Sequence, residues 1–149
     1  MQTFNQRMSE ALAVLATIDP ISQAAGTAVS GWVSAANGKR LLALVDVGVF
    51  GAAATVDAKL QQATSAGGAG AKDITGKLIT QLVAAGGNSR QVAINLADDE
   101  LDVTNGFAYV QLSITVGAAA TLISGLILGG TSYQTADGYN QAGVAQVVA

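Results

Sequence analysis

Hydrophobic and polar residues alternate most clearly between positions 107 and 130, in a stretch that contains no charged residue. From position 108 to 116 every second residue is small or aliphatic, and the residues between them are polar or aromatic. This period of two predicts a β-strand with one apolar face. Residues 117–120 permit a chain reversal, and residues 121–128 are largely apolar on both faces, so we expect a second strand in the interior of a sheet.

The same stretch could also be a membrane-spanning helix, because it exceeds the roughly 20 apolar residues that cross a bilayer. Three features favour strands instead. Gln111, Ser113 and Thr115 recur at alternate positions, no Lys or Arg flanks either end to orient a helix, and β-branched residues and glycines are frequent. We therefore expect two strands here and no membrane partner.

Shorter apolar or alternating runs predict further strands, at residues 27–34, 40–50, 53–64, 78–83 and 91–96. Asn37-Gly38 is the dipeptide most typical of a tight hairpin turn, and glycine-rich connections follow at 65–72 and 85–88. Residues 1–20 fit both a helical and a strand period. We expect a short helix or irregular arm there, passing into an extended segment that Asp19-Pro20 ends.

About seven or eight short strands with glycine-bearing turns and little helix indicate an all-β protein. We expect an antiparallel β-sandwich of jelly-roll type with extended N- and C-terminal arms. The expected division is an N-terminal arm at 1–26, a β-sandwich domain at 27–130 and a C-terminal arm at 131–149. The core is expected to hold apolar residues of the longest strands, namely Leu44, Val45, Val110, Leu112, Ile114, Leu122 and Leu126.

The amino-acid composition excludes several classes of function. The chain has 149 residues without cysteine or histidine, which excludes disulfide scaffolds, zinc sites and every histidine-dependent catalytic triad. Charged residues make up 11% of the chain, against about a quarter in ordinary domains. So little charge implies that much of the surface is covered by something.

The charges are unevenly distributed along the chain. All seven basic residues lie in the first 90 positions beside five acidic ones, which gives +2, whereas the remaining positions hold five acidic residues and no basic one, which gives −5. Binding to nucleic acid phosphates would need a clustered basic face, so nucleic acid is not an expected partner. The N-terminus shows no basic region followed by an apolar core and a cleavage site, so we expect no signal peptide.

Two segments could carry chemistry, and neither has the required pattern. Residues 65–72 lack the glycine spacing of a phosphate-binding loop, and Asp73 stands where Ser or Thr should hold magnesium. The acidic residues 98–102 lack the ligand spacing of a calcium loop. We expect them to form a solvated connection with one helical turn, capped by Asp98 or Asp99.

No catalytic, cofactor-binding or metal-binding residue can be assigned, and we expect no enzyme. A Ser or Thr nucleophile needs a base, and no lysine or carboxylate stands at a motif spacing to supply one. Asp46 interrupts the otherwise apolar strand at 40–50. We expect it to be a buried or half-buried carboxylate paired with the backbone or a basic neighbour.

Two long segments carry a resemblance to a known family. They are GWVSAANGKRLLALVDVGVFGAAATVDAKLQQATSAGGAGAKDITGKLITQL and DELDVTNGFAYVQLSITVG, together with the hydrophobic tail and the lead-in FNQRMSEALAVLATIDP. Across residues 27–130 the chain resembles the head decoration, or cement, proteins of tailed bacteriophages and prophages. The resemblance implies a structural virion protein that binds the major capsid protein on the outer surface of the assembled head and stabilises the capsid lattice. It implies no active residues.

The two ends are the expected contact surface, because they hold more apolar residues than free tails usually do. We expect them to join a homo-oligomer, a dimer or a trimer, and to contact the capsid shell. The residues concerned are Phe4, Leu12, Leu15, Tyr133, Tyr139, Val144, Val147 and Val148.

A second hypothesis keeps the sandwich but makes it a receptor- or carbohydrate-binding module of a phage tail or fibre. Sugar sites usually present exposed aromatic side chains. The candidates are Trp32, Phe107, Tyr109, Tyr133 and Tyr139, although Trp32 is expected in the core.

Overall fold

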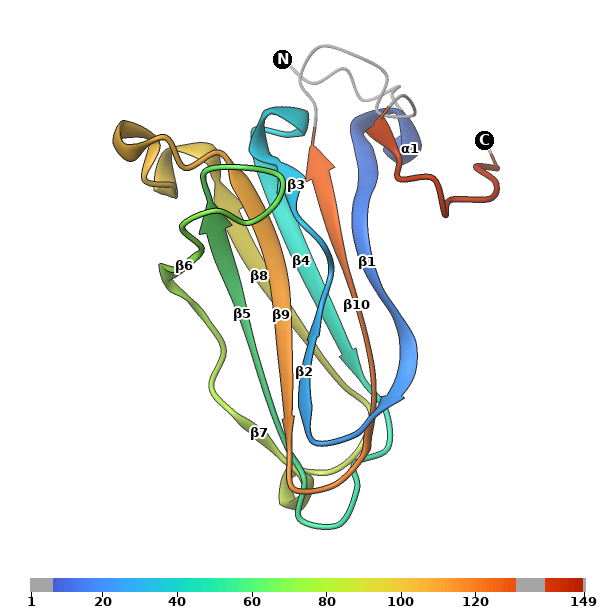
Figure 1. Ribbon diagram of the computed structural model, residues 1–149. Helices are drawn as coiled ribbons and strands as arrows, with labels where there is room; N and C mark the ends of the chain where they lie inside the picture. The colour runs from blue at the N-terminus through green and yellow to red at the C-terminus, as the bar shows by residue number, and fades with distance from the viewer. Residues whose placement is uncertain (1–6, 131–138, 149) are drawn as a thin grey trace.

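The protein folds into two antiparallel β-sheets packed face to face (Figure 1). A computed structural model describes residues 7–130 and 139–148. In these residues the strands are β1 (Leu12–Gln23), β2 (Gly26–Val29), β3 (Val33–Ser34), β4 (Arg40–Val47), β5 (Thr55–Ala63), β6 (Lys72–Leu78), β7 (Leu82–Val83), β8 (Arg90–Ala97), β9 (Tyr109–Gly117) and β10 (Thr121–Gly130). The helical elements described in full are α1 (Met8–Ala11) and the 3-10 turns η1 (Ala35–Asn37), η2 (Ala84–Gly86), η3 (Asp98–Glu100) and η4 (Val103–Asn105).

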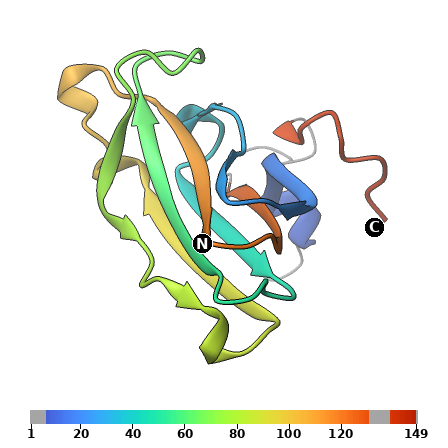
Figure 2. The same ribbon diagram turned by 60° about the horizontal axis from the view of Figure 1, so that its bottom comes forward.

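The strand order is that of a jelly roll. One sheet has the order β1-β10-β4-β8, and the other has the order β2-β9-β5-β6, with β3 also paired to β9 and β7 to β5. The pairs β1–β10, β2–β9, β4–β8 and β5–β6 nest inside one another along the chain, as they do when one long hairpin is folded over into two sheets (Figures 1 and 2). The expected all-β, antiparallel sandwich of jelly-roll type is confirmed.

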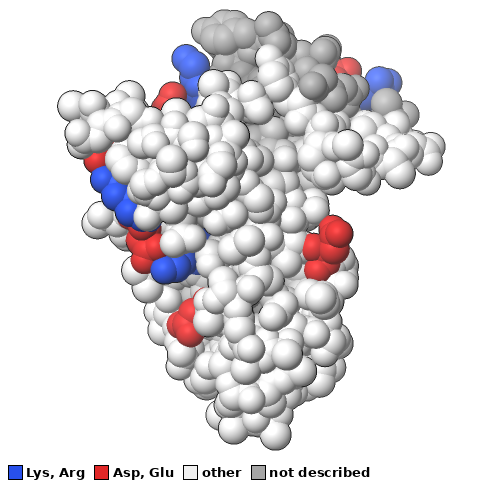
Figure 3. Space-filling view, in the orientation of Figure 1, with Lys and Arg blue, Asp and Glu red and all other residues white. Residues whose placement is uncertain are grey.

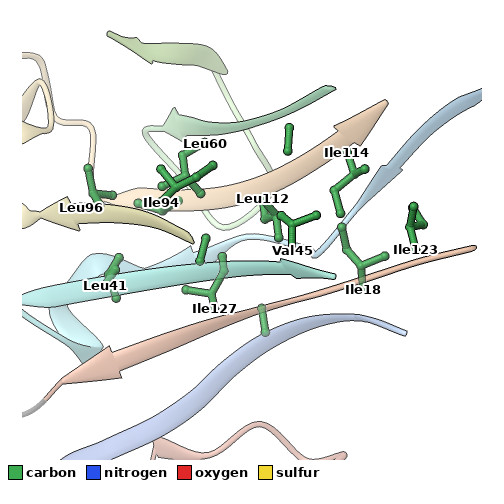
Figure 4. Packing of buried hydrophobic residues seen from close by; sticks show 14 of the residues in the cluster. Ile18, Leu41, Val45, Leu60, Ile94, Leu96, Leu112, Ile114, Ile123 and Ile127 are labelled. Atoms are coloured by element: carbon green, nitrogen blue, oxygen red, sulfur yellow. The ribbon is translucent and has the colours of Figure 1, made fainter. Parts of the chain in front are cut away.

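The core lies between the inner faces of the two sheets (Figure 4). Val110, Leu112 and Ile114 of β9 are fully buried there, and Val45 and Ile127 of the opposite sheet are 1% exposed. The alternation that predicted the register of β9 is therefore confirmed. So is the interior position of the following strand, since β10 lies between β1 and β4.

Glycines on the inner face of β10 set how closely the sheets approach. A Cβ atom on Gly125 would lie 2.8 Å from Cδ2 of Leu112 and 3.3 Å from Cδ1 of Ile114. Similarly, a Cβ atom on Gly129 would lie 2.6 Å from Cδ1 of Leu15. Each glycine thus leaves the space that a large aliphatic side chain fills, which is how close packing is reached across this part of the core.

Residues 107–130 do not form a helix. They contain β9 and β10, and no helix among the described residues is long and apolar enough to cross a membrane.

The expected end of the N-terminal segment at Asp19-Pro20 is wrong. Strand β1 runs from Leu12 through Pro20 to Gln23 and pairs with β10 along its length, with a register shift between Ile18 and Ile21. Proline is tolerated because β1 is an edge strand of its sheet and the irregularity falls at that point. Residues 12–23 therefore belong to the sandwich rather than to an arm, although the short helix before them agrees with the prediction.

Two further local predictions are wrong. Asn37-Gly38 does not turn a hairpin, because β3 joins β9 in one sheet and β4 joins β10 and β8 in the other. Asn37 instead ends the 3-10 turn η1, so this segment is a corner between the sheets. The strand expected at 78–83 is also misplaced, since β6 ends at Leu78 and only Leu82–Val83 pairs again, with β5.

Three of the expected core leucines are not in the core. Leu44 and Leu126 are half-buried on the outer face of the β1-β10-β4-β8 sheet, and Leu122 is 46% exposed. A strand that is apolar on both sides does not reveal which side faces the core, and here the inner positions are Val45, Ile123 and Ile127.

Leu112→Ala should lower the free energy of unfolding by about 2–5 kcal/mol, because it leaves a cavity at a fully buried position. Denaturant unfolding measures the loss. Leu78→Ala is the matched control, since Leu78 is 69% exposed and its truncation should change stability by no more than about 0.5 kcal/mol. Equal losses in the two variants would contradict the central position of Leu112.

Candidate interaction surfaces

The acidic connection between β8 and β9 is held by lysines of β6. Nζ of Lys77 lies 2.7 Å from Oε1 of Glu100, and Lys72 pairs with Asp102. A third ion pair joins Lys59 of β5 to Asp73 of β6 at 2.8 Å. These three pairs tie the edge strand β6 to its neighbours.

Each of the three carboxylates has a pKa below its ordinary value. The Lys59 ammonium and the Gln61 amide hydrogen-bond to Asp73 and lower its pKa. The pKa of Glu100 is lowered by the hydrogen bonds from Lys77 and from the backbone N–H of Ala97. Asp102 has a lowered pKa because Lys72 and then Asn105 donate to it. These groups are therefore charged and engaged within the fold.

One helical turn capped by Asp98 or Asp99 is expected in this connection, but the structure has two 3-10 turns, η3 and η4, and neither of these residues caps them. Turn η3 begins after Ala97, whose N–H donates to Oε2 of Glu100 at 2.8 Å. Gln62, which is 5% exposed, accepts the Asp102 N–H at 2.8 Å and anchors the connection to β5. Within the described part of the chain, no three Asp or Glu residues lie close enough together to hold a metal ion.

Asp46 differs from the expectation of a buried, backbone- or base-paired carboxylate. It is exposed on the outer face of β4 and accepts a hydrogen bond from Nε2 of Gln91 on the neighbouring strand β8, at 2.8 Å. Asp57 on β5 of the other sheet has the same arrangement with Nε2 of Gln81, also at 2.8 Å.

The glycine-rich loop packs against aromatic residues. A Cβ atom on Gly68 would lie 2.5 Å from Nε1 of Trp32, so only glycine fits there, and Gly68 has a φ of +81°. Trp32 is half-buried beside this loop rather than in the core, which corrects its expected position. Phe107 is also half-buried and has Nζ of Lys72 4.1 Å from its ring centroid. These aromatic rings help hold the loop and do not form an open platform.

The residues predicted as contacts at the two ends have different environments. Phe4 and Tyr133 lie outside the described residues. Leu15 is 6% exposed in the core, so it is not available to a partner, and Leu12 is half-buried. Tyr139 packs against the core cluster and Val144 is half-buried, whereas Val147 and Val148 are 40% and 82% exposed.

The C-terminal segment lies along the free edge of β1. The N–H of Gln141 donates to the Val14 carbonyl at 2.7 Å, and the N–H of Val14 donates to Oδ1 of Asn140 at 2.8 Å. Both ribbon views place this segment beside the N-terminal end of β1 (Figures 1 and 2). It therefore covers part of an edge that would otherwise expose backbone donors and acceptors.

The opposite, narrow end of the sandwich carries no charged residue in its four loops. We call this surface the loop tip; it consists of residues 24–25, 48–54, 84–89 and 118–120, and 14 of these 18 residues are alanine or glycine. In the view of Figure 3 this end shows no charged atoms. Arg90 lies directly beside it, but its guanidinium donates to the Gly86 carbonyl at 2.9 Å.

The loop tip is tightly built. A Cβ atom on Gly51 would lie 2.4 Å from the Ala120 carbonyl oxygen, so two loops touch through their backbones. The Asn88 side chain accepts the Phe50 N–H at 3.0 Å, which joins a third loop. Ala53 and Ala118 have positive φ angles of 56° and 67°, a conformation that is sparsely populated without glycine. Loops held by such backbone contacts and hydrogen bonds lose little conformational entropy when they bind a partner.

Sequence reasoning did not find the loop tip, because its parts are far apart in the chain. The only local signal was the recurrence of alanine and glycine between strands. These runs indicate turns, but only the jelly-roll connectivity places all four at one end.

The outer faces of the two sheets differ in polarity. On the β2-β9-β5-β6 sheet the outward positions are mainly polar, with Val29 and Leu78 as exposed exceptions; for example, Thr27 and Thr115 share a 2.9 Å hydrogen bond, and Lys59 forms an ion pair with Asp73. On the β1-β10-β4-β8 sheet the outward positions are mainly aliphatic. We call this second surface the leucine face; its central residues are Leu42, Leu44, Leu126 and Leu128.

The sequence matches no protein-family model and no curated protein. Solved structures give distant similarities. One is the N-terminal endo-1,4-beta-D-xylanase 10B of Clostridium thermocellum, with its CBM22-1 and GH10 modules complexed with xylohexaose, at a TM-score of 0.46 and 12% identity over 88% of this chain and 28% of that chain. This chain thus spans less than a third of the xylanase structure.

Two others come from cowpea mosaic virus. The top component, described as naturally occurring empty particles, gives a TM-score of 0.42 and 8% identity over 85% of this chain and 92% of that chain. An empty virus-like particle gives a TM-score of 0.33 and 12% identity over 73% and 59%.

Acid should weaken the fold through the β6 ion pairs. Because the pKa values of Asp73, Glu100 and Asp102 are lowered in the folded state, their contribution is present above their ordinary values of 3.8 and 4.5 and is lost as pH falls below them. The thermal midpoint should therefore drop between about pH 5 and pH 3. Asp102→Asn should reduce this drop.

Asp99→Asn is the control for this experiment, because Asp99 is exposed and belongs to none of the three ion pairs. Its drop between pH 5 and 3 should match that of the unaltered protein. If Asp102→Asn leaves the pH dependence unchanged, the Lys72–Asp102 pair does not contribute to stability.

Proposed function

We propose that this protein is a structural virion protein, a capsid decoration or cement protein that binds the major capsid protein on the outside of an assembled phage head. The observation that carries the proposal is the loop tip, a closely packed end whose four loops hold no charged residue, on a chain that is itself poor in charge. This proposal also agrees with the family that residues 27–130 resemble.

A surface of small uncharged residues suits attachment to a preassembled lattice. Alanine and glycine let a partner approach the backbone closely, and the four loops themselves hold no charged side chain that has to be removed from water on contact. Hydrogen bonds such as the one that the Phe50 N–H donates to the Asn88 side chain fix the loops before binding, which lowers the entropy lost on attachment. Many copies of a modest contact can then stabilise a shell through multivalency.

The proposed role is not enzymatic. The carboxylates that the sequence offered as candidate chemistry form ion pairs or hydrogen bonds that hold loops and strands, as Glu100 and Asp102 do. The alternative of a sugar-binding module receives no specific support, because Trp32 and Phe107 are half-buried against the 65–72 region.

The proposal is tested by co-pelleting the purified protein with undecorated shells of the phage's major capsid protein. Val49 is 56% exposed in the loop tip, and Val49→Asp should weaken binding at least about tenfold, because the new carboxylate must be desolvated at the contact. Val103→Asp is the matched control, since Val103 is 64% exposed at the opposite end of the sandwich. Binding should change little with salt, because the four loops of the loop tip hold no charged residue and the adjacent Arg90 guanidinium donates to the Gly86 carbonyl.

A third variant that lacks residues 139–149 tests the contact expected at the C-terminal end. If this truncation abolishes binding while Val49→Asp does not, the C-terminal segment rather than the loop tip contacts the shell. If the unaltered protein does not pellet with shells at any salt concentration, the decoration role is wrong.

A further inference from the structure

The leucine face is an apolar surface of half-buried leucines on the outer side of the β1-β10-β4-β8 sheet. Leu42 and Leu44 alternate with Leu41, Ala43 and Val45, which point into the core, so the two leucines point outward. Leu126 and Leu128 lie directly beside them, since Leu126 pairs with Leu44 and Leu128 with Leu42. An aliphatic sheet face of this kind normally packs against another surface.

The charges at the two ends of this face have opposite signs. Along β4 the outward row reads Arg40, Leu42, Leu44, Asp46, with both charged residues exposed. Within the described chain neither charge has an opposite charge at ion-pair distance, and Asp46 is hydrogen-bonded through one oxygen to Gln91. The row is therefore aliphatic in the middle, basic at one end and acidic at the other.

Such a row is complementary to itself when it is reversed. If a second copy lies on the leucine face with its β4 antiparallel, Leu42 faces Leu44 of that copy and Arg40 faces its Asp46. The neighbouring strand β10 follows the same symmetry. The two-fold axis lies at the level of Ala43 and Ile127, so Leu126 of one copy faces Leu128 of the other. Each contact occurs twice, as a two-fold interface requires.

We propose that the leucine face binds a second copy of this chain, about a two-fold axis that lies in the interface and runs perpendicular to the strands. The other in-plane axis, parallel to the strands and through the centre of the face, would exchange β4 with β10. It would place Arg40 opposite Gly130 and Asp46 opposite Ser124, so neither charge would face an opposite charge. The strands of two packed sheets are usually inclined to each other by about 30°, which moves Arg40 away from the facing Asp46. The long Arg40 side chain can span this displacement.

The size of the face predicts a weak dimer. Four strands about 4.8 Å apart and six residues of about 3.3 Å each outline a patch about 20 Å on a side, or roughly 400 Å². This is about half of the area per partner in a standard interface, so dissociation should be measurable by dilution.

The antiparallel dimer would bridge capsid subunits, a consequence that rests on the proposed function. In an antiparallel dimer the two loop tips point in opposite directions, away from each other. With the two-fold axis perpendicular to the shell, each tip would reach a different capsid subunit, and the dimer would bridge them. The dimer itself does not depend on shell binding and is tested without shells.

Sedimentation velocity of the full chain over a concentration series is the test. The unaltered protein should show a reversible equilibrium between the 14.8 kDa protomer and a dimer. Arg40→Asp and Asp46→Arg should each raise the dimer dissociation constant about tenfold or more, because like charges then face each other. The double variant with both reversals should recover the dimer.

Mixing the two single variants gives a sharper result. Arg40→Asp carries two acidic ends and Asp46→Arg two basic ends, so the antiparallel arrangement predicts a heterodimer, which native mass spectrometry distinguishes by mass. Asp57→Arg is the matched control, because Asp57 lies on the outer face of the other sheet and is hydrogen-bonded by Gln81 as Asp46 is by Gln91. It should not change the dissociation constant.

Three results would overturn the proposal. One is a monomer at every concentration of the unaltered protein. Another is a dimer that the single reversals leave unchanged or that the double reversal does not restore. The third is an equal weakening by Asp57→Arg. Circular dichroism of each variant confirms that the β-structure is retained.

Discussion

Strand β10 imposes the constraint on which the rest of the structure depends. It lies between β1 and β4, and its inner face carries Ile123 and Ile127, with Gly125 between them and Gly129 after them. Gly125 lets Leu112 of the other sheet approach, so the two sheets lock together at this point. Because the outward side chains of β10 are also mainly leucines, burying one face of this strand leaves a second apolar face outside the protomer.

Charged residues are few, and those in ion pairs lie in one part of the fold. The three ion pairs of the described residues hold the edge strand β6 and the acidic connection to β9, at one side and end of the sandwich. The loops at the opposite end contain no charged residue, and they are positioned by backbone contacts and by the Asn88 side chain. The long axis of the sandwich thus separates a charged, ion-paired end from an uncharged, rigid one.

The sequence predicted the fold class and the register of β9, because alternation over nine residues allows one arrangement of the two faces. It did not predict that Leu44 and Leu126 face outward, since a strand with two apolar faces gives no sign of which face is inside. Nor can local signals show that β3 and β4 belong to different sheets, which is why Asn37-Gly38 predicts a hairpin that the structure does not contain. The candidate contact residue Leu15 proved to be core, because β1 is part of the sheet.

Electron cryo-microscopy of the phage particle, at a resolution that traces strands, tests the proposed role most directly. A decoration protein of the kind proposed should appear as a jelly roll on the outer surface of the head, with residues 48–54 and 118–120 of the loop tip against capsid subunits. A head without this protein, or one that holds it with the loop tip in solvent, would contradict the role.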